Sequence, residues 1–492
     1  MSVPIRQRDL LLNSKITPAY SVSFRSSGYD PVGVREDLAR GMVARVAVGD
    51  ERVRNDFDRV PIFQRPVCNA TWDKRKKRWV DFAWQGEQGF SWSPTEPFRE
   101  VLYRCQPFWY CVDMSDDAPC WVSVSQYPLE GYSLAPMFKN GKDFVYRPCF
   151  EMGIGEDGLP HSRAGLKPCK LEPPDLMGRA RSFDTDAATT ERAAEWFSDL
   201  LLLWVEFGTR KIQTQMHGFA RVAEVVQAQY VGQPEPGVAL LRLSGELADR
   251  LFSGMFVSLS GEQSAAVFCK EARVKQAVIK EGNELEALLE GKFDFSKLYE
   301  SDDAEREQVS MTLLFAQSGL ALPCVCNASS GAPASPVNGY TPMTWRGKEN
   351  AWGNLSSLIC DVRLGTKVAN GVYRHSVYSL DDCRQWSKEL NENWRLCDIV
   401  STVQSWAYIQ SFACDSKRPW VMFPKLVQGY SSRYHCAVLR TPVYSDCSLF
   451  TGGGHYDYKS YVSPCSQILM VTNSWDGLSL GGARLILHEG GL

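Results

Sequence analysis

The sequence predicts an α+β fold, on three observations. Short aromatic stretches broken by Pro, Gly and Asp run through residues 65–152, and their alternation is typical of strands with one buried face. Residues 189–206 carry apolar side chains at helical spacing. Residues 226–289 are rich in Val, Glu and Leu between short turns, which indicates a compact β-rich unit.

Changes in composition divide the chain into four segments. Residues 1–95 are expected to form an N-terminal attachment or assembly region, with a charged helical piece near 34–60. Residues 96–225 and 311–492 are expected to be two parts of one domain, and 226–310 a β-rich insertion between them. At 492 residues the chain exceeds what one hydrophobic core usually serves.

The individual elements follow in chain order. The stretches WVDFAW, QPFWYCV, CWVSVSQY and KDFVYRPCFEM each predict a strand. The helix at 189–206 begins with Thr and Glu, and its apolar face is expected to pack on a sheet. Its face consists of Ala194, Phe197, Leu200, Leu201 and Trp204.

Composition argues against several classes of partner. The formal net charge of -3 provides no basic field for a nucleic-acid backbone or an anionic membrane, so neither nucleic acid binding nor membrane insertion is expected. The N-terminus has no apolar core of signal-peptide length, and the most apolar stretch, at 200–205, is too short to span a bilayer. We therefore expect a soluble chain made in the cytoplasm, where the 16 cysteines are buried free thiols.

The second half of the chain contains two framework motifs. Residues 341–362 read TPMTWRGKENAWGNLSSLICDV, in which Gly permits a tight backbone, Asn bonds neighbouring main chain and the Trp rings fill core. Near the end, GGARLIL predicts a closing core strand. The predicted structural residues are Trp345, Arg346, Gly347, Trp352, Gly353, Asn354, Gly453, Gly454, Gly482 and Arg484.

Taken together, the RGKENAWGN segment, the upstream AAEW helix, the Gly453-Gly454 turn and the terminal GGARL strand resemble the C-type-lectin fold of the formylglycine-generating-enzyme type. They are similar, more narrowly, to the variable proteins of diversity-generating retroelements, many of which are phage tail receptor-binding proteins. The resemblance covers residues 106–487, with 226–289 as an insertion. It implies a C-type-lectin-like domain that presents a diversified surface.

The region 430–473 is crowded with Tyr, Ser, Asp, His and Cys, contains Lys459 as its only lysine, and is followed by no glutamate before Glu489. Tyrosine supplies contact area at low entropy cost and Ser and Asn supply adaptable hydrogen bonds, as in antibody paratopes. The resemblance implies mutagenic copying at adenines, which reaches these residue types but cannot produce Lys, Glu, Gln, Met or Trp. The alternative is a Tyr- and Ser-rich β region that only pairs strands. The predicted contact residues are Tyr430, Ser432, Tyr434, His435, Tyr444, Asp446, His455, Tyr456, Asp457, Tyr458, Tyr461, Asn473 and Asp476.

We expect non-catalytic recognition of a host cell-surface receptor, either a protein or a glycan. We also expect the chain to be located in the virion tail, to contact other tail proteins and to assemble as a homo-oligomer, namely a trimer. A cytoplasmic or surface-displayed bacterial protein is the alternative location. The competing functions are a structural tail or baseplate protein and a copper-dependent oxidase.

No cofactor or metal site is predicted. The late cysteines Cys324, Cys326, Cys436, Cys447 and Cys465 stand in no context that matches the paired copper-binding cysteines of the oxidase. The six histidines show no zinc-binding spacing.

Overall fold

The computed structural model is dominated by strands, so the predicted α+β class is wrong. Strands account for 47% and helices for 13% of the structure. The structure describes residues 17–24, 30–49, 53–94, 99–113, 121–138, 143–219, 225–248, 250–261, 267–296, 308–322, 331–332, 341–369, 372–387, 389–402, 407–428, 438–440, 447–453, 467–471 and 481–490. Within these ranges there are two α-helices, α2 (Pro173–Phe183) and α3 (Ala193–Phe207). The prediction gave too much weight to a single well-marked helix.

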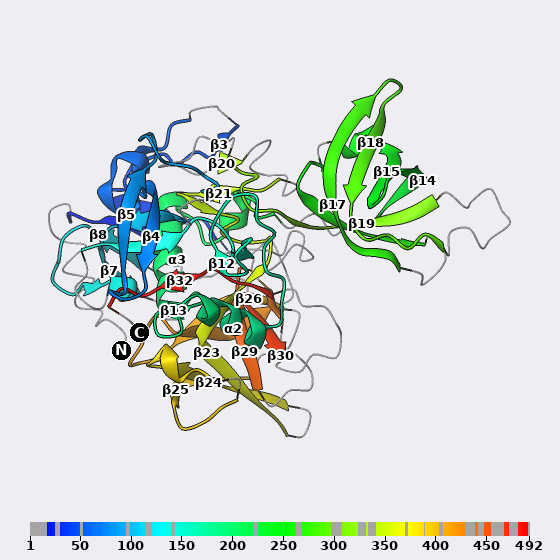
Figure 1. The fold of residues 1–492 in the computed structure, drawn as a ribbon. Coiled ribbons are helices and arrows are strands. Elements are labelled where there is room, and N and C mark those ends of the chain that lie inside the picture. The colour runs from blue at the N-terminus through cyan, green and yellow to red at the C-terminus, as the bar shows by residue number, and fades with distance from the viewer. Residues whose placement is uncertain are drawn as a thin grey trace.

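The N-terminal part forms two antiparallel sheets (Figure 1). The strands predicted from the four aromatic stretches are confirmed within them as β5, β7, β8 and β10. The first sheet has the order β2 (Val34–Asp37), β1 (Tyr20–Ser23), β8 (Trp121–Ser125), β7 (Trp109–Asp113) and β9 (Ser133–Leu134). The second has the order β10 (Val145–Pro148), β6 (Glu100–Cys105), β4 (Val67–Asp73) and β5 (Arg78–Trp84).

The described residues of 34–60 contain no α-helix, so the helical piece predicted there is wrong. This stretch instead holds β2, the short strand β3 (Ala47–Val48) and the 3-10 turn Asp56–Arg59. Gly41 and Gly49 both adopt positive φ angles there, at 77° and 54°, which interrupt a helix. The charged residues that suggested a helix face are used in local pairs such as Arg54 with Asp56.

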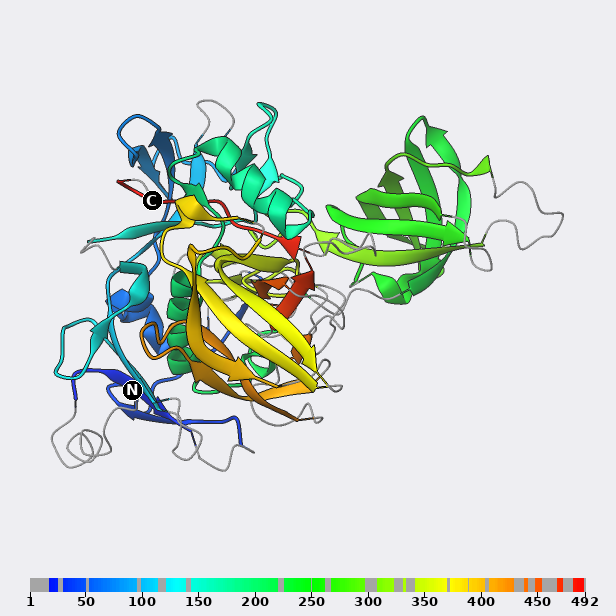
Figure 2. The ribbon, with the colours of Figure 1, turned by 90° about the horizontal axis from the view of Figure 1, so that it is seen from below.

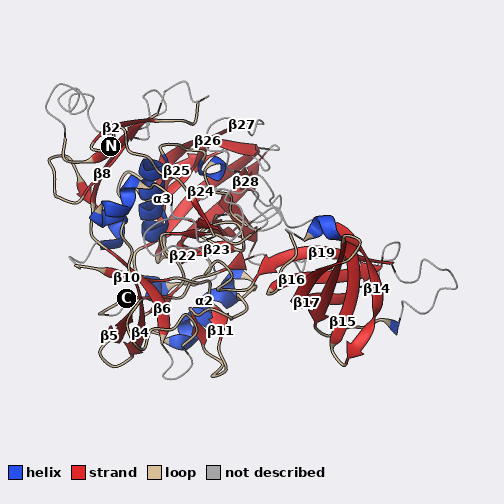
Figure 3. Ribbon diagram, turned by 90° about the horizontal axis from the view of Figure 1, so that it is seen from above, coloured by secondary structure: helices blue, strands red, loops and turns tan. Residues whose placement is uncertain are grey.

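Helix α3 lies at the centre of the molecule, and every one of its residues is buried. It contacts β1 and β8 on one side and the central strand β23 (Ser356–Ala369) on the other (Figure 3). The predicted helix is confirmed, but it starts at Ala193 because the preceding residues form β13 (Ala188–Thr189), which pairs with β32 (Ile486–Leu487). Gly208, with φ 63°, ends it.

The C-terminal part is built on a nine-stranded sheet. Its order is β25 (Trp394–Ser401), β24 (Val372–Leu380), β23, β29 (Cys447–Gly452), β30 (Gln467–Val471), β28 (Val438–Arg440), β26 (Ala407–Cys414) and β27 (Met422–Gln428), with β31 (Gly481–Gly482) paired to β23. Three small sheets accompany the larger ones. They are β22 (Lys348–Glu349), β21 (Thr344–Trp345), β20 (Gly331–Ala332) and β3; the pair β11 (Gly153–Ile154) and β12 (Pro160–His161); and the pair β13 and β32.

Six strands between Val225 and Ala316 form a closed barrel that projects to one side of the other layers (Figures 1 and 2). Alternate side chains such as Leu241, Ala287 and Leu259 point inward and make a separate hydrophobic core. Strands are therefore confirmed in this stretch. The barrel order is β14 (Val225–Glu235), β15 (Val238–Ser244), β18 (Glu284–Glu290), β17 (Val267–Lys280), β16 (Met255–Gly261) and β19 (Gln308–Ala316), which returns to β14.

Two further expectations concern cysteines and membranes. The ten cysteines whose side chains are described are free thiols, and all except Cys414 are buried, as predicted. Among the described residues, no helix has both the length and the apolar character needed to cross a bilayer.

Candidate functional site

The predicted contact residues belong to four connections between strands of the nine-stranded sheet, and all of them lie outside the described residues. Tyr430, Ser432, Tyr434 and His435 belong to 429–437, and Tyr444 and Asp446 to 441–446. His455, Tyr456, Asp457, Tyr458 and Tyr461 belong to 454–466, and Asn473 and Asp476 to 472–480. The structure describes the strands that these connections join, β27 to β31.

Two of the connections join the sheet at the same end of neighbouring strands. β28 and β30 run parallel, with Leu439 paired to Gln467, so 429–437 and 454–466 both lead into this end. β29 runs antiparallel to β30, and its last residue, Gly452, also pairs with Gln467. Connection 454–466 is therefore anchored at this end on both sides.

The other two connections start at the opposite end of the same strands. Connection 441–446 leads from β28 into β29, where Ser448 pairs with Val471, and 472–480 leaves β30 at Val471. Connection 472–480 leads into β31, where Gly482 pairs with Ser357, the residue of β23 that also pairs with Gly452. Because β30 has only five residues, the two ends are about 13 Å apart.

The predicted framework residues surround this sheet, and those that the structure describes are buried. Trp345 and Arg346 both donate to the carboxylate of Glu206 in α3, at 2.9 and 2.8 Å, and the Arg346 guanidinium lies over the Phe63 ring. Burial alone would raise the pKa of Glu206, but Arg346 and the other donors hold it below its usual value. Gly347 follows with φ 83°, which a non-glycine residue rarely adopts.

Trp352 connects the framework to the end of β29. Its indole donates to Gln213 Oε1 at 2.9 Å, and a Cβ on Gly453 would lie 3.4 Å from the Trp352 Cβ. Gly453 is the last described residue before 454–466, so this connection begins on a fixed aromatic side chain. Gly454 lies outside the described residues.

Asn354 joins the framework to the barrel. Its side-chain oxygen accepts from Ala316 N at 2.7 Å and its amide donates to Glu151 Oε2 at 2.5 Å. Burial raises the pKa of Glu151 to about 7. At the closing strand, Gly482 packs against Leu355, and the buried Arg484 donates to the carbonyl of Cys149 at 3.0 Å.

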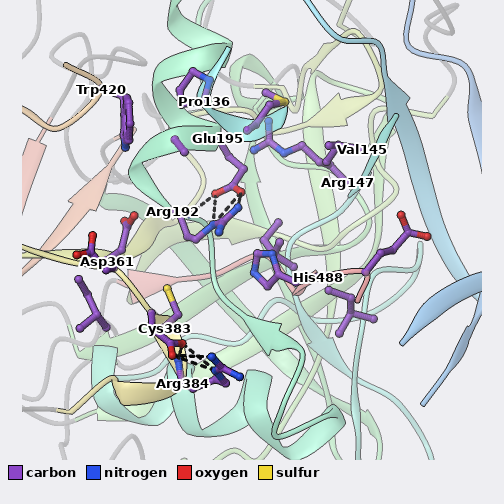
Figure 4. A pocket seen from close by; sticks show the side chains of 18 of the residues that line it. Pro136, Val145, Arg147, Arg192, Glu195, Asp361, Cys383, Arg384, Trp420 and His488 are labelled. Carbon is purple, nitrogen blue, oxygen red and sulfur yellow. Dashed lines mark hydrogen bonds and ion pairs between the residues drawn. The ribbon is translucent and has the colours of Figure 1, made fainter. Parts of the chain in front are cut away.

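A separate cavity of about 350 Å³ opens between the second N-terminal sheet, the start of α3 and the nine-stranded sheet (Figure 4). Its wall is polar, and most of its charges are paired with one another. Arg192 bonds to Glu195, and Arg384 pairs with Asp382 at 2.8 Å. Trp420 and His488 border the space on opposite sides.

Asp361 is the most perturbed acid in this cavity wall. One of its carboxyl oxygens accepts from Ala193 N at 2.7 Å, at the first turn of α3, and burial raises its pKa to about 6. A buried acid of this kind beside a cavity marks a candidate site for binding or proton transfer. Its charge is partly balanced by Arg192.

No family model matches the chain, and no curated protein matches it.

Sequence reasoning missed the two thiols that the fold brings together. Cys360 on β23 and Cys383 in the 3-10 turn Cys383–Gln385 have their Sγ atoms 3.9 Å apart, and Cys383 lines the cavity. Their separation of 23 residues carries no recognisable motif, so no signal in the sequence pairs them. Of the late cysteines weighed for copper, Cys447 lies on β29 with its side chain undescribed, and the others are outside the described residues.

A second buried cluster joins the layers, and one of its members, Arg147, also lines the cavity of Figure 4. Arg147 and Lys348 both bond to Glu191 and Asp199, and Arg65 donates to Asp199 at 2.7 Å. These cations hold the pKa of Asp199 well below its usual value. The cluster joins the second N-terminal sheet, α3 and β22. In the part of the chain that the structure describes, no group of three or more His, Cys, Asp and Glu side chains could hold a metal ion.

Proposed function

We propose that this chain is a non-catalytic phage receptor-binding protein that presents a diversified surface on a C-type-lectin-like scaffold to a host cell-surface protein or glycan. The observation that supports this proposal most directly is how the predicted contact segments are connected to the sheet. All four connections that contain the predicted contact residues join strands β27 to β31 within one sheet. Residues spread over 430–476 thus share one supporting element.

The residue types on these connections suit recognition. Tyr and His offer broad contact with few rotatable bonds, and Ser, Asn and Asp add hydrogen bonds that adapt to different partners. Gln467 and Met470, which adenine mutagenesis cannot produce, both lie on strand β30. Lys459 and Trp475, which this mutagenesis cannot produce either, belong to the connections 454–466 and 472–480, so diversification of this region requires all four of these positions to be fixed.

The buried framework supplies the rigidity that such exchange requires. Trp352 and Gly453 pack against each other, and Trp345 and Arg346 are hydrogen-bonded to the fully buried helix α3. Substitution on a connection leaves these contacts in place, so the scaffold tolerates it. Loops on a rigid scaffold are where proteins most often carry binding residues.

The test combines Tyr456→Ala with Tyr458→Ala. The double variant is expected to keep the thermal midpoint of the wild type and to lose at least tenfold in binding to host cells, because two aromatic contacts are removed from the surface. Tyr127→Ala is the matched control, since Tyr127 is 55% exposed and lies on the N-terminal part of the chain. Fluorescently labelled protein on intact cells gives the binding curve.

Unchanged cell binding by the double variant would count against receptor recognition by 454–466. If the same residues are protected from labelling in assembled particles but not in the isolated protein, they are buried against another virion chain. That result would favour the alternative function, a structural tail protein. The neighbouring DNA gives an independent check. Diversification requires a near-copy of the final coding stretch that differs mainly at adenines, beside a reverse transcriptase gene.

A further inference from the structure

We propose that Cys360 and Cys383 form an oxidisable dithiol, which small hydroperoxides convert into an intrachain disulfide in the wall of the Figure 4 cavity. The two Sγ atoms are 3.9 Å apart, and both thiols are buried, with exposures of 0% and 4%. A disulfide needs an S–S distance of about 2.05 Å, so the sulfurs must approach by about 2 Å. This proposal does not depend on the proposed receptor surface.

Main-chain hydrogen bonds hold both cysteines in position. Cys360 N donates to Glu191 O at 2.9 Å, which fixes this residue of β23 against the start of α3. The carbonyl of Cys383 accepts from Arg181 of α2 at 2.7 Å and from Trp386 N at 3.2 Å. The pair is therefore set by the fold, and closure requires only side-chain rotation and a small shift of the turn Cys383–Gln385.

The cavity gives the two sulfurs different roles. Cys383 lines the cavity, which is large enough for a hydroperoxide to reach it. Cys360 lies behind it, where its thiol bonds to the carbonyl of Thr190 at 3.6 Å. The Arg192 guanidinium is close enough to Cys383 to interact electrostatically with it. Cys383 is therefore the residue that meets the oxidant, and Cys360 the residue that resolves the product.

The chemistry balances in two steps. The Cys383 sulfur attacks the O–O bond of a hydroperoxide, which gives Cys383 sulfenic acid and releases an alcohol, or water when the oxidant is hydrogen peroxide. The Cys360 sulfur then displaces the hydroxyl from the Cys383 sulfur, which gives the disulfide and one molecule of water. Both thiol protons leave in these products, and one hydroperoxide is reduced for each disulfide.

Oxidation would fix one wall of the cavity. Asp382 and Arg384 flank Cys383 and line the cavity, so joining Cys383 to β23 restrains both. The bond also closes a loop of 22 intervening residues, which restricts the unfolded chain and raises the thermal midpoint by a few degrees.

The experiment uses the full chain, freed of reductant and treated with one to a few equivalents of hydrogen peroxide. The remaining thiols are alkylated under denaturing conditions, and the peptides are mapped by mass spectrometry. We expect one dominant cross-linked peptide that joins Cys360 to Cys383. In Cys360→Ser, dimedone should trap the sulfenic acid on Cys383, whereas Cys383→Ser should leave Cys360 unmodified.

Cys269 is the internal reference, because it is 4% exposed like Cys383 but lies alone in the barrel core. It should stay alkylatable at every dose, and Cys269→Ser should form the same cross-link as the wild type. If a serine variant does not fold, the corresponding alanine variant replaces it. Absence of the cross-link, its formation only together with oxidation of Cys269, or equal trapping on Cys360 and Cys383 would overturn the proposal.

Discussion

Asp361 shows how one buried carboxyl makes stability depend on pH. It is 8% exposed, bonds to the first turn of α3 and has a folded-state pKa raised to about 6 from 3.8. The folded chain therefore binds its proton more tightly than the unfolded chain does. The stability that this group contributes is complete below pH 3.8 and is lost as the pH rises through 6.

We expect Asp361→Asn to remove this loss. A shift of this size corresponds to about 3 kcal/mol, so the variant should gain up to about that much relative to the wild type between pH 4 and pH 8. Asparagine keeps an oxygen that can accept from Ala193 N, which preserves the helix cap. Urea unfolding at pH 4, 6 and 8 measures the difference.

The control for this prediction is Glu130→Gln, which changes an exposed carboxyl and should alter stability by less than about 0.5 kcal/mol. A stability difference between Asp361→Asn and the wild type that stays constant across the three pH values would contradict the assignment. The residue itself was not among the sequence predictions, because an Asp within an apolar strand gives no sign of which helix end it will meet.

At the scale of elements, the sequence predicted correctly those helices and strands that depend on local pattern, and it failed for those that depend on pairing with other strands. Strands with regular aromatic alternation, such as β5 and β8, and the apolar face of α3 follow from local pattern. The strands β3 and β13, which replace the predicted helix in part of 34–60 and at the start of α3, do not follow from local pattern, because both pair with strands far along the chain. Ala188 and Thr189, for example, pair with residues about 300 positions away.

Gly353, in the turn between β22 and β23, lies where the fold leaves no room for a larger residue. Gly353 has φ 101°, and a Cβ there would lie 2.8 Å from Phe219 N, where backbone cannot give way. We expect Gly353→Ala to cost about 2–5 kcal/mol, as strain and overpacking add together. Chemical unfolding followed by tryptophan fluorescence measures it.

Gly86→Ala separates the two contributions. Gly86 has a similar φ of 91° but nothing within 4 Å of a Cβ, so only the strain of about 1 kcal/mol should remain. Equal losses for the two variants would show that the close approach to Phe219 is unimportant. The sequence predicted Gly353 as a framework residue from its motif, but the neighbour that requires glycine comes from 134 residues earlier in the chain and could not be read from it.

At the scale of the whole molecule, the barrel and the other layers have separate hydrophobic cores. The barrel encloses its own apolar cluster, whereas α3 and the sheets on either side share another. The buried Asn354, bonded to both Ala316 and Glu151, links the two parts. Because the two cores are separate, changes in the barrel core should leave strands β28, β29 and β30 in place.

The proposed receptor binding would use a small polar surface on each chain, for which we expect modest affinity per site, and this argues for several copies of the chain acting together. Linking sites turns each later contact into an intramolecular event and can raise avidity by about 10²–10⁴-fold without new contacts. We therefore predict a homotrimer, whose sedimentation-equilibrium mass is three times that of the chain. Its dissociation from cells should slow as receptor density rises, since only a multivalent particle can bridge receptors. A protein that is monomeric both in solution and in the assembled particle, with a dissociation rate independent of receptor density, would refute the trimer.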